Sequence, residues 1–219
     1  MKTLLILSGG MDSTTLLYDL LKQGDEVTCL SFNYGQRHKK ELKKAKLTTK
    51  KLGVKHHIVN ISKIYKVVMS QNSLTGNIEV PEGHYAEETM KQTVVPYRNG
   101  ILLMIAAGVA ATLKYDRVAY GAHAGDHAIY PDCTPEFVEG MKHVLKIGDY
   151  QHLDLYSPYQ TMDKGDIAIK GKELNVDYKK TWTCYKGKKL ACGKCGACRE
   201  RLEAFEKAGI KDVIKYENN

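Results

Sequence analysis

The chain contains no run of about 18 consecutive apolar residues, the length that a membrane-spanning helix needs, although hydrophobic residues make up 43% of it. We therefore expect no membrane-spanning segment. The N-terminus, from Met1 to Ser8, holds too short an apolar stretch for a signal peptide, and no small-residue cleavage site follows it. Internal repeats and low-complexity linkers are also absent. The missing membrane span and signal peptide predict a cytoplasmic protein. The length of 219 residues predicts one domain with a small appendage.

The net charge of +8 favours an anionic partner, such as a nucleotide, a carboxylate or nucleic acid. Many lysines gather in one short stretch: Lys39, Lys40, Lys43, Lys44, Lys46, Lys50 and Lys51. We interpret this stretch as the solvated face of one helix. A surface that binds RNA or DNA is the alternative.

Short apolar runs and helical periodicity alternate along the first two-thirds of the chain. The runs predict strands at 3–7, 26–32, 55–61, 116–121 and 152–156. Helices are expected at 12–22, 36–52, 99–113, 135–147 and 163–174. This order predicts an α/β fold, a Rossmann-like parallel sheet with helices on both faces. Ligands bind such sheets beyond the carboxyl ends of the strands, here at residues 8–14, 33–37, 121–134 and 157–164.

The first predicted strand runs into Ser8-Gly9-Gly10-Met11-Asp12-Ser13-Thr14. Two glycines allow a tight turn and a close ligand, and the N-terminus of the next helix attracts anions. Asp12 would repel phosphate unless a cation lay between them, so Asp12 implies Mg²⁺. A plain strand-to-helix turn capped by serine or aspartate is the alternative.

The full motif resembles the pyrophosphate loop of the ATP pyrophosphatase superfamily, and it lacks the Gly-Lys-Ser/Thr of a Walker A loop. The resemblance implies that ATP is cleaved between its α and β phosphates. It also implies that the nucleotide is bound by the loop and its flanks: Leu7, Ser8, Gly9, Gly10, Met11, Asp12, Ser13, Thr14, Thr15, Leu16 and Leu17.

Four of the six cysteines follow the pattern Cys184-x7-Cys192-x2-Cys195-x2-Cys198. Clustered thiols in a cytoplasmic protein indicate a metal rather than disulfides. Four thiolates with no open position describe a closed structural zinc site, and an iron–sulfur cluster is the alternative. We expect a nucleotide-binding α/β domain at 1–180, with a loop insertion at 71–95, and a small zinc-binding C-terminal subdomain at 181–219.

These two sites occur together with further motifs: Tyr34-Gly35-Gln36-Arg37-His38, Val95-Pro96-Tyr97-Arg98-Asn99 and Tyr130-Pro131-Asp132-Cys133. In this combination the chain resembles the 7-cyano-7-deazaguanine synthase family across residues 4–205. Two positions depart from the family pattern. Thr134 replaces an arginine that often follows Pro-Asp-Cys, and Tyr97 replaces a glycine that is frequent before the arginine.

The resemblance implies ATP-dependent conversion of 7-carboxy-7-deazaguanine and ammonia to 7-cyano-7-deazaguanine through adenylated intermediates, in a homodimer. Its candidate catalytic residues are Arg98 for a carboxylate or phosphate, Lys164 for the α-phosphate and Asp132 for the base or Mg²⁺. Asp126 is a further candidate for the base or Mg²⁺, and His123 and His127 are candidates for proton transfer.

Other functions remain alternatives at this point. A related enzyme of the same superfamily could thiolate RNA or transfer a deazaguanine to a macromolecule. From another class, the cysteines could form a nucleic-acid-binding zinc ribbon beside a nucleotide sensor. The short chain offers no separate RNA-binding domain, so we expect small-molecule substrates rather than a nucleic acid or a membrane.

Overall fold

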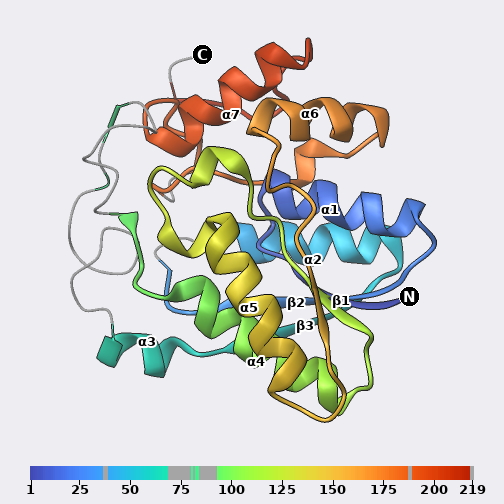
Figure 1. The fold of residues 1–219 in the computed structure, drawn as a ribbon. Helices are drawn as coiled ribbons and strands as arrows, with labels where there is room; N and C mark the ends of the chain where they lie inside the picture. The colour runs from blue at the N-terminus through green and yellow to red at the C-terminus, as the bar shows by residue number, and fades with distance from the viewer. Residues whose placement is uncertain (37–38, 69–79, 81, 84–92, 187–188, 218–219) are drawn as a thin grey trace.

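The computed structural model describes residues 1–36, 39–68, 80, 82–83, 93–186 and 189–217 (Figure 1). Its strands and helices are β1 Lys2–Ile6, α1 Met11–Lys22, β2 Glu26–Asn33, α2 Lys40–Leu52, β3 Lys55–Asn60, α3 Ser62–Val68, α4 Arg98–Thr112, β4 Arg117–Ala119, α5 Pro135–Ile147, β5 Asp154–Tyr156, α6 Lys164–Glu173 and α7 Gly196–Lys207. None of the described helices is long and apolar enough to cross a membrane.

Every strand and helix expected from the sequence is present, with ends shifted by at most four residues. The largest shift is at α2, which was expected from residue 36 and begins at Lys40. Gln36 instead closes a turn after β2, because its side chain accepts from the Tyr34 N–H and donates to the Phe32 carbonyl. Helices α3 and α7 were not predicted. The expected insertion at 71–95 lies mostly outside the described residues.

The five strands form one parallel sheet in the order β3-β2-β1-β4-β5. The chain builds outward from β1 to β3 and then returns to place β4 on the other side of β1. The strand order thus reverses between β1 and β4. In open α/β sheets, the carboxyl ends of the strands at this reversal mark the usual ligand site. The predicted α/β, Rossmann-like fold is confirmed.

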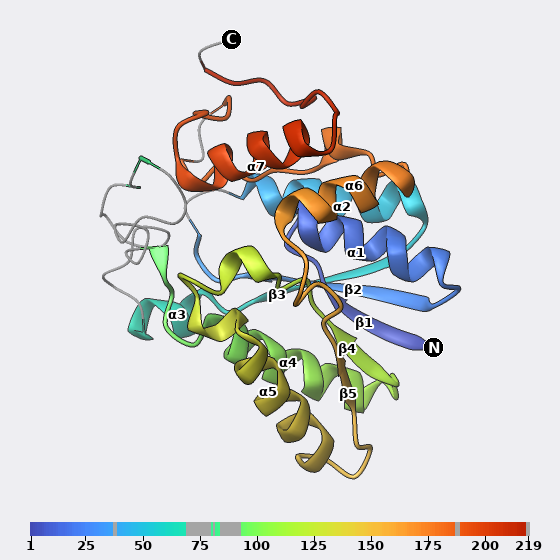
Figure 2. The same ribbon diagram turned by 45° about the horizontal axis from the view of Figure 1, so that its top comes forward.

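Helices cover both faces of the sheet. Figure 2 shows α1 and α2 on one side and α4 and α5 on the other. One hydrophobic cluster joins Leu4 and Val118 of the strands to Leu103 of α4, and another joins Leu5 to Leu16 of α1. Because helices cover both faces, the central strands β1, β2 and β4 are almost entirely buried, whereas the edge strand β3 is polar and largely exposed.

Helices α6 and α7 form a further layer over α1 and α2 (Figure 2). Met11 of α1, Ala168 of α6, and Ala204 and Phe205 of α7 share one small apolar cluster. The C-terminal segment therefore packs directly against the helix that follows the pyrophosphate loop.

Candidate active site

One cavity opens at the carboxyl ends of β1, β2 and β4, at the reversal of strand order. Its lining includes the loop residues Leu7, Ser8, Gly10, Met11, Asp12 and Ser13, and more distant residues such as Arg98, Cys133 and Lys164. The remaining residues of the expected nucleotide segment, Gly9, Thr14, Thr15, Leu16 and Leu17, do not line it. Leu16 and Leu17 belong to the core, where they hold α1 against the sheet.

The loop is held in shape by its own serines. The Ser8 N–H donates to Ser13 Oγ at 3.2 Å, the two serine hydroxyls lie 2.9 Å apart, and the Gly10 N–H donates to Ser8 Oγ at 3.1 Å. Gly9 has φ +90°, and a Cβ there would lie 2.2 Å from the Glu41 carbonyl oxygen. Only glycine fits this turn, which brings the start of α1 to the cavity.

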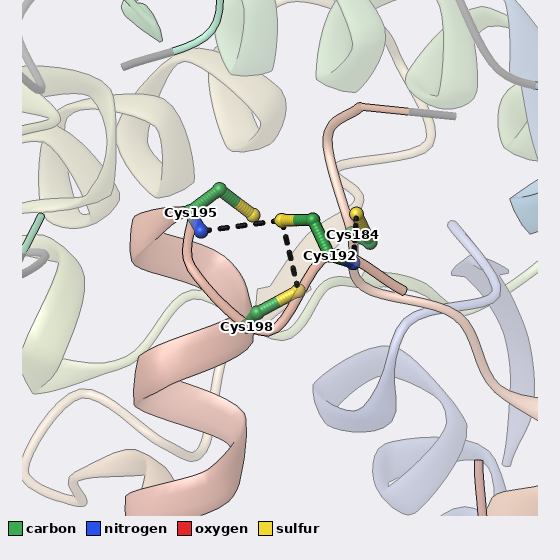
Figure 3. Close-up of side chains that lie close together, drawn as sticks. All are labelled: Cys184, Cys192, Cys195 and Cys198. Atoms are coloured by element: carbon green, nitrogen blue, oxygen red, sulfur yellow. Dashed lines mark hydrogen bonds between the residues drawn. The ribbon is translucent and has the colours of Figure 1, made fainter. Parts of the chain in front are cut away.

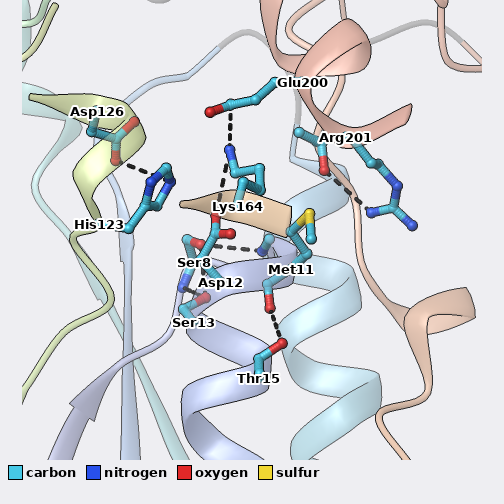
Figure 4. Close-up of polar contacts among 12 residues, drawn as sticks. Ser8, Met11, Asp12, Ser13, Thr15, His123, Asp126, Lys164, Glu200 and Arg201 are labelled. Atoms are coloured by element: carbon cyan, nitrogen blue, oxygen red, sulfur yellow. Dashed lines mark hydrogen bonds and ion pairs between the residues drawn. The ribbon is translucent and has the colours of Figure 1, made fainter. Parts of the chain in front are cut away.

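A charged cluster surrounds Lys164 at the start of α6 (Figure 4). Its Nζ lies 2.5 Å from Glu200 Oε2 and 3.7 Å from Asp12 Oδ2. Burial disfavours the ammonium, but the carboxylates of Asp12, Glu200 and Asp126 outweigh burial and raise the pKa of Lys164. Lys164 is therefore a permanent cation beside the pyrophosphate loop.

Two acids of the cluster differ in their surroundings. Burial raises the pKa of Glu200, and the charge of Lys164 opposes this rise. Asp12 has a buried oxygen, Oδ1, without a hydrogen-bond partner among the described residues. A buried carboxylate oxygen without a partner is costly, so Asp12 Oδ1 is suited to an incoming cation.

Arg98 lies at the first position of α4 and lines the same cavity, as do Tyr34, Tyr130 and Tyr185. Burial disfavours its charge, but these tyrosines and Asp132 outweigh it and raise the pKa of Arg98. Within the described part of the chain, its guanidinium forms no salt bridge. Arg98 thus presents a fixed positive charge that can bind a carboxylate or a phosphate.

Asp132 lies behind this surface and does not line the cavity. Its Oδ2 accepts from the Asn99 N–H at 2.8 Å, and its carbonyl accepts from Asn99 Nδ2 at 3.1 Å. The same Nδ2 lies 3.2 Å from the sulfur of Cys133, which does line the cavity. Burial raises the pKa of Cys133, so this group is a neutral thiol. Asp132 thus holds the start of α4, where Arg98 lies.

His123 is 1% exposed, and its Nε2 lies 3.4 Å from Asp126 Oδ2. Asp126 lines the cavity, whereas His123 and His127 do not.

The two departures from the family pattern have structural roles. Tyr97 is 79% exposed and has φ +51°, a left-handed conformation that favours glycine. Thr134 is the N-cap of α5, where its hydroxyl accepts from the Phe137 N–H at 3.3 Å. Neither residue lines the cavity.

The four cysteine sulfurs lie within 4.8 Å of one another, and all four residues are buried (Figure 3). Four sulfurs around a zinc ion, each at about 2.3 Å from it, would lie about 3.8 Å apart in a tetrahedron. The Sγ atoms of Cys192 and Cys198 are 3.9 Å apart. The N–H groups of Lys194 and Cys195 point to the sulfur of Cys192, a contact that stabilises a thiolate. The cluster can therefore hold a metal ion.

The cysteine segment also contacts the pyrophosphate loop. The Trp182 N–H donates to the Gly9 carbonyl at 3.0 Å, and Lys40 Nζ lies 4.2 Å from the centre of the Trp182 ring. Lys44 and Lys51 of α2 bind the Lys179 carbonyl and the Asp177 carboxylate. These three lysines hold the C-terminal part of the chain, while Lys39, Lys43, Lys46 and Lys50 are exposed.

Sequence reasoning missed Glu200, Glu41 and Trp182. Glu41 lines the cavity, and burial raises its pKa to about 8. Its place in a lysine-rich segment gave no sign of this environment. Glu200 lies two residues beyond the last cysteine, and only a prediction of α7 would have directed attention to it.

Three comparisons place the chain among known proteins. The model of a family described as queuosine biosynthesis protein QueC matches residues 2–209. Proteins named 7-cyano-7-deazaguanine synthase from Methanoregula boonei and Pseudoalteromonas translucida are 56% and 54% identical. These matches cover 99% of this chain and 100% and 99% of the two relatives.

Solved structures show the same fold at low sequence identity. The NMN synthetase from Francisella tularensis has a TM-score of 0.56 and 16% identity, over 96% of this chain and 78% of its own. A 4-thiouridine synthetase, in a complex with RNA and bound ATP, has a TM-score of 0.56 and 18% identity, over 95% of this chain and 50% of its own.

Proposed function

Because this chain belongs to the QueC family of queuosine biosynthesis proteins, we propose that it is an ATP-dependent ligase that makes 7-cyano-7-deazaguanine from 7-carboxy-7-deazaguanine and ammonia. The observation that carries the proposal is the shared cavity. The pyrophosphate loop and Lys164 lie in its lining together with Arg98, a cation without a salt bridge in the described part of the chain. One cavity thus offers cationic groups to a triphosphate and to a carboxylate.

The proposed reaction uses two ATP molecules. A carboxylate oxygen attacks the α-phosphorus of the first ATP, and the bond to pyrophosphate breaks. Ammonia then displaces AMP from the acyl adenylate and leaves an amide. The amide oxygen attacks a second ATP in the same way, and loss of AMP and protons gives the nitrile. Both carboxylate oxygens therefore leave the substrate in AMP.

These steps require stabilised anions rather than a protein nucleophile. The N–H groups at the start of α1 and the hydroxyls of Ser8 and Ser13 would bind phosphate oxygens. Lys164 would withdraw charge from the α-phosphate, and Arg98 would orient the carboxylate. Asp132 would act through Asn99 by fixing the start of α4. We place Asp132 as a positioning residue, because it does not line the cavity.

Magnesium fits at Asp12. Its Oδ1 is buried and has no hydrogen-bond partner in the ranges that the structure describes, and its carboxylate lies in the lining beside Ser8 and Ser13. The ion supplies positive charge to the leaving pyrophosphate when it is bound. We also propose zinc for the four cysteines, whose sulfur separation suits tetrahedral thiolates. The six cysteines form no disulfide within the described residues, and reduced cysteines are usual in a cytoplasmic enzyme.

A homodimer is the proposed assembly, with α4 at its interface. This helix is apolar on all sides, yet its Met104 is 48% exposed and its C-cap residue Leu113 is 45% exposed. Ile105, Gly108 and Val109 line a shallow depression beside them. A helix that is apolar all round is normally buried, and a second copy of the chain would cover this face.

Isotope labelling tests the reaction. The metal-loaded protein is incubated with Mg²⁺, ATP, ammonia and 7-carboxy-7-deazaguanine that carries ¹⁸O in both carboxylate oxygens. We expect a nitrile and two AMP molecules, each with one ¹⁸O, by mass spectrometry. A nitrile with unlabelled AMP would contradict the adenylate route. AMP formed only in the presence of RNA would favour the RNA-modifying alternative.

A further inference from the structure

Glu200 brings the cysteine-rich segment into the active site. It lies on α7, two residues after Cys198, and its side chain is 13% exposed. Its Oε2 lies 2.5 Å from Nζ of Lys164, which lies 36 residues earlier in the chain. A Cβ on Gly125 would lie 3.1 Å from Glu200 Oε1 and from the His123 ring. The second carboxylate oxygen of Glu200 thus lies close to the turn Ala124–Asp126.

Glu200 and Asp12 both attract the same ammonium. The distance from Lys164 Nζ to Asp12 is 3.7 Å, longer than the 2.5 Å to Glu200. The stronger contact holds Nζ away from Asp12 and leaves Asp12 Oδ1 without a hydrogen-bond partner in the described part of the chain. Without Glu200, Asp12 would be the nearest acid for the buried cation, and Lys164 would shift toward it.

The metal-binding cysteines determine where Glu200 lies. Cys195 is the N-cap of α7, and Cys198 lies in its first turn. A metal held by both fixes the start of the helix, and the side chain of Glu200 extends from the turn that follows directly. At the other side of α7, Phe205 and Ala204 pack with Met11, which follows the glycines of the loop.

We propose that Glu200 is a positioning residue for the adenylation step. It holds the Lys164 ammonium 3.7 Å from Asp12 Oδ2, beyond hydrogen-bond distance, so that Asp12 Oδ1 stays available to magnesium and the ammonium stays available to the α-phosphate. It also connects the four-cysteine site to catalysis. This inference rests on the proposed function. The contacts that carry it would act on the triphosphate of ATP, and they do not depend on which carboxylic acid is adenylated.

A double-mutant cycle tests the proposal. Glu200→Gln keeps the shape of the side chain and removes its charge, and Lys164→Met removes its partner. Both variants and their combination are measured, with the metal loaded, for kcat, for KM and for the dissociation constant of Mg²⁺-ATP. We expect Glu200→Gln to lower kcat roughly 10- to 100-fold, as loss of an orienting contact does, and to change the KM for the carboxylic acid little.

Residues that act as a unit give non-additive effects, so the double variant is expected to be no worse than Lys164→Met alone. Glu206→Gln is the matched control, because it makes the same charge change on an exposed part of α7. The zinc content of Glu200→Gln is expected to match that of the wild type, whereas the midpoint of thermal unfolding falls because the buried Lys164 loses its closest partner. A purely structural role would lower the zinc content and raise the KM together with the loss of kcat.

Two outcomes would overturn the inference. The first is a Glu200→Gln protein with the kcat and ATP affinity of the wild type. The second is a double-mutant cycle in which the effects of Glu200→Gln and Lys164→Met on kcat, or on ATP binding, are additive. Failure of the proposed function gives a different result, because the wild type would then form no nitrile. The double-mutant cycle measured in the dissociation constant of Mg²⁺-ATP would still decide the role of Glu200.

Discussion

At the residue scale, Gly9 sets the shape of the pyrophosphate loop. Gly9→Ala places a Cβ against the Glu41 carbonyl and keeps a φ of +90°, which alanine rarely adopts. We expect a loss of at least about 2 kcal/mol in the free energy of unfolding, measured in urea, and weaker ATP binding.

Gly140 provides the control for this substitution. It is exposed in the middle of α5, and a Cβ there meets nothing within 4 Å. Gly140→Ala is expected to stabilise the protein by roughly 0.5–1 kcal/mol, the helix preference of alanine over glycine. A Gly9→Ala protein as stable as Gly140→Ala would show that the loop tolerates a side chain.

Glu41 predicts a pH dependence of stability. Burial first, and then the negative charges of Asp12 and Cys184, raise its pKa from 4.5 to about 8. A carboxyl group with a raised pKa binds its proton more tightly in the folded state, so it opposes folding increasingly as the pH rises from 4.5 to 8. The free energy of unfolding of Glu41→Gln, relative to that of the wild type, is therefore expected to rise by more than about 1 kcal/mol between pH 4 and pH 8.

Urea titrations at both pH values measure this gain. An equal difference between variant and wild type at pH 4 and pH 8 would show that Glu41 ionises normally.

The glycines, Asp12 and Arg98 could be identified from the sequence because each lies in a local motif whose residue types suit anions. Glu200 could not, since it meets Lys164 only through the packing of α6 on α7. The position of Asp132 behind the cavity was equally hidden. A turn motif does not reveal which side of the turn faces the ligand.

At the element scale, α7 is the longer of the two helices, α3 and α7, that sequence patterns did not reveal. Ala197, Ala204, Phe205 and Ala208 have helical spacing and are buried. Arg201 interrupts this stripe with a charge, although it is itself fully buried. Its partners lie elsewhere in the chain, so a pattern based on apolar residues misses the helix. Strands and helices with continuous apolar faces were predicted to within a few residues.

Arg201 ties the C-terminal part of the chain together. Its Nε and Nη2 donate to the Asp212 carboxylate at 2.8 and 3.0 Å, and its Nη1 donates to Thr181 Oγ1 at 2.8 Å. Arg201→Met leaves Asp212 buried without its cation. We expect the free energy of unfolding, measured in urea, to fall by about 3–5 kcal/mol. Arg199→Met, on the exposed side of α7, is expected to stay within about 0.5 kcal/mol of the wild type.

The same ion pair has a pH signature. Burial raises the pKa of Asp212, but Arg201 and the Tyr216 hydroxyl outweigh burial and lower it below 3.8. The stabilisation by this ion pair is therefore complete above pH 3.8, and it is lost as the pH falls through the lowered pKa of Asp212 in the folded protein. The difference in stability between the wild type and Asp212→Asn is expected to shrink below that pH, and a constant difference would contradict this account.

The cysteine cluster is the second feature at this scale. Cys198→Ser removes one of four thiolates, and we expect loss of most of the bound zinc and a lower thermal midpoint. Elemental analysis measures the metal. Cys29→Ser is the control, because Cys29 lies in β2, outside the cluster. Purified protein that contains iron and sulfide instead of zinc would support the alternative cluster.

For the whole molecule, the exposed face of α4 predicts self-association. Met104→Glu introduces a charge at a side chain that is 48% exposed in one copy of the chain. We expect the single copy to stay folded and the dimer to dissociate, measured by sedimentation equilibrium. Val213→Glu, at a residue of similar exposure in the C-terminal segment, is expected to remain dimeric. A wild type that sediments as a monomer would contradict the proposed assembly.

The contact of Trp182 with Gly9 has a consequence for biosynthesis. The pyrophosphate loop is among the first parts to leave the ribosome. The partners of its Gly9 carbonyl and of Lys164 on α6, which are Trp182 and Glu200, are synthesised much later. The sheet can pair earlier, since its last strand ends at Tyr156. Nucleotide binding is therefore expected to be the final property that a growing chain acquires, so that incomplete chains hydrolyse no ATP.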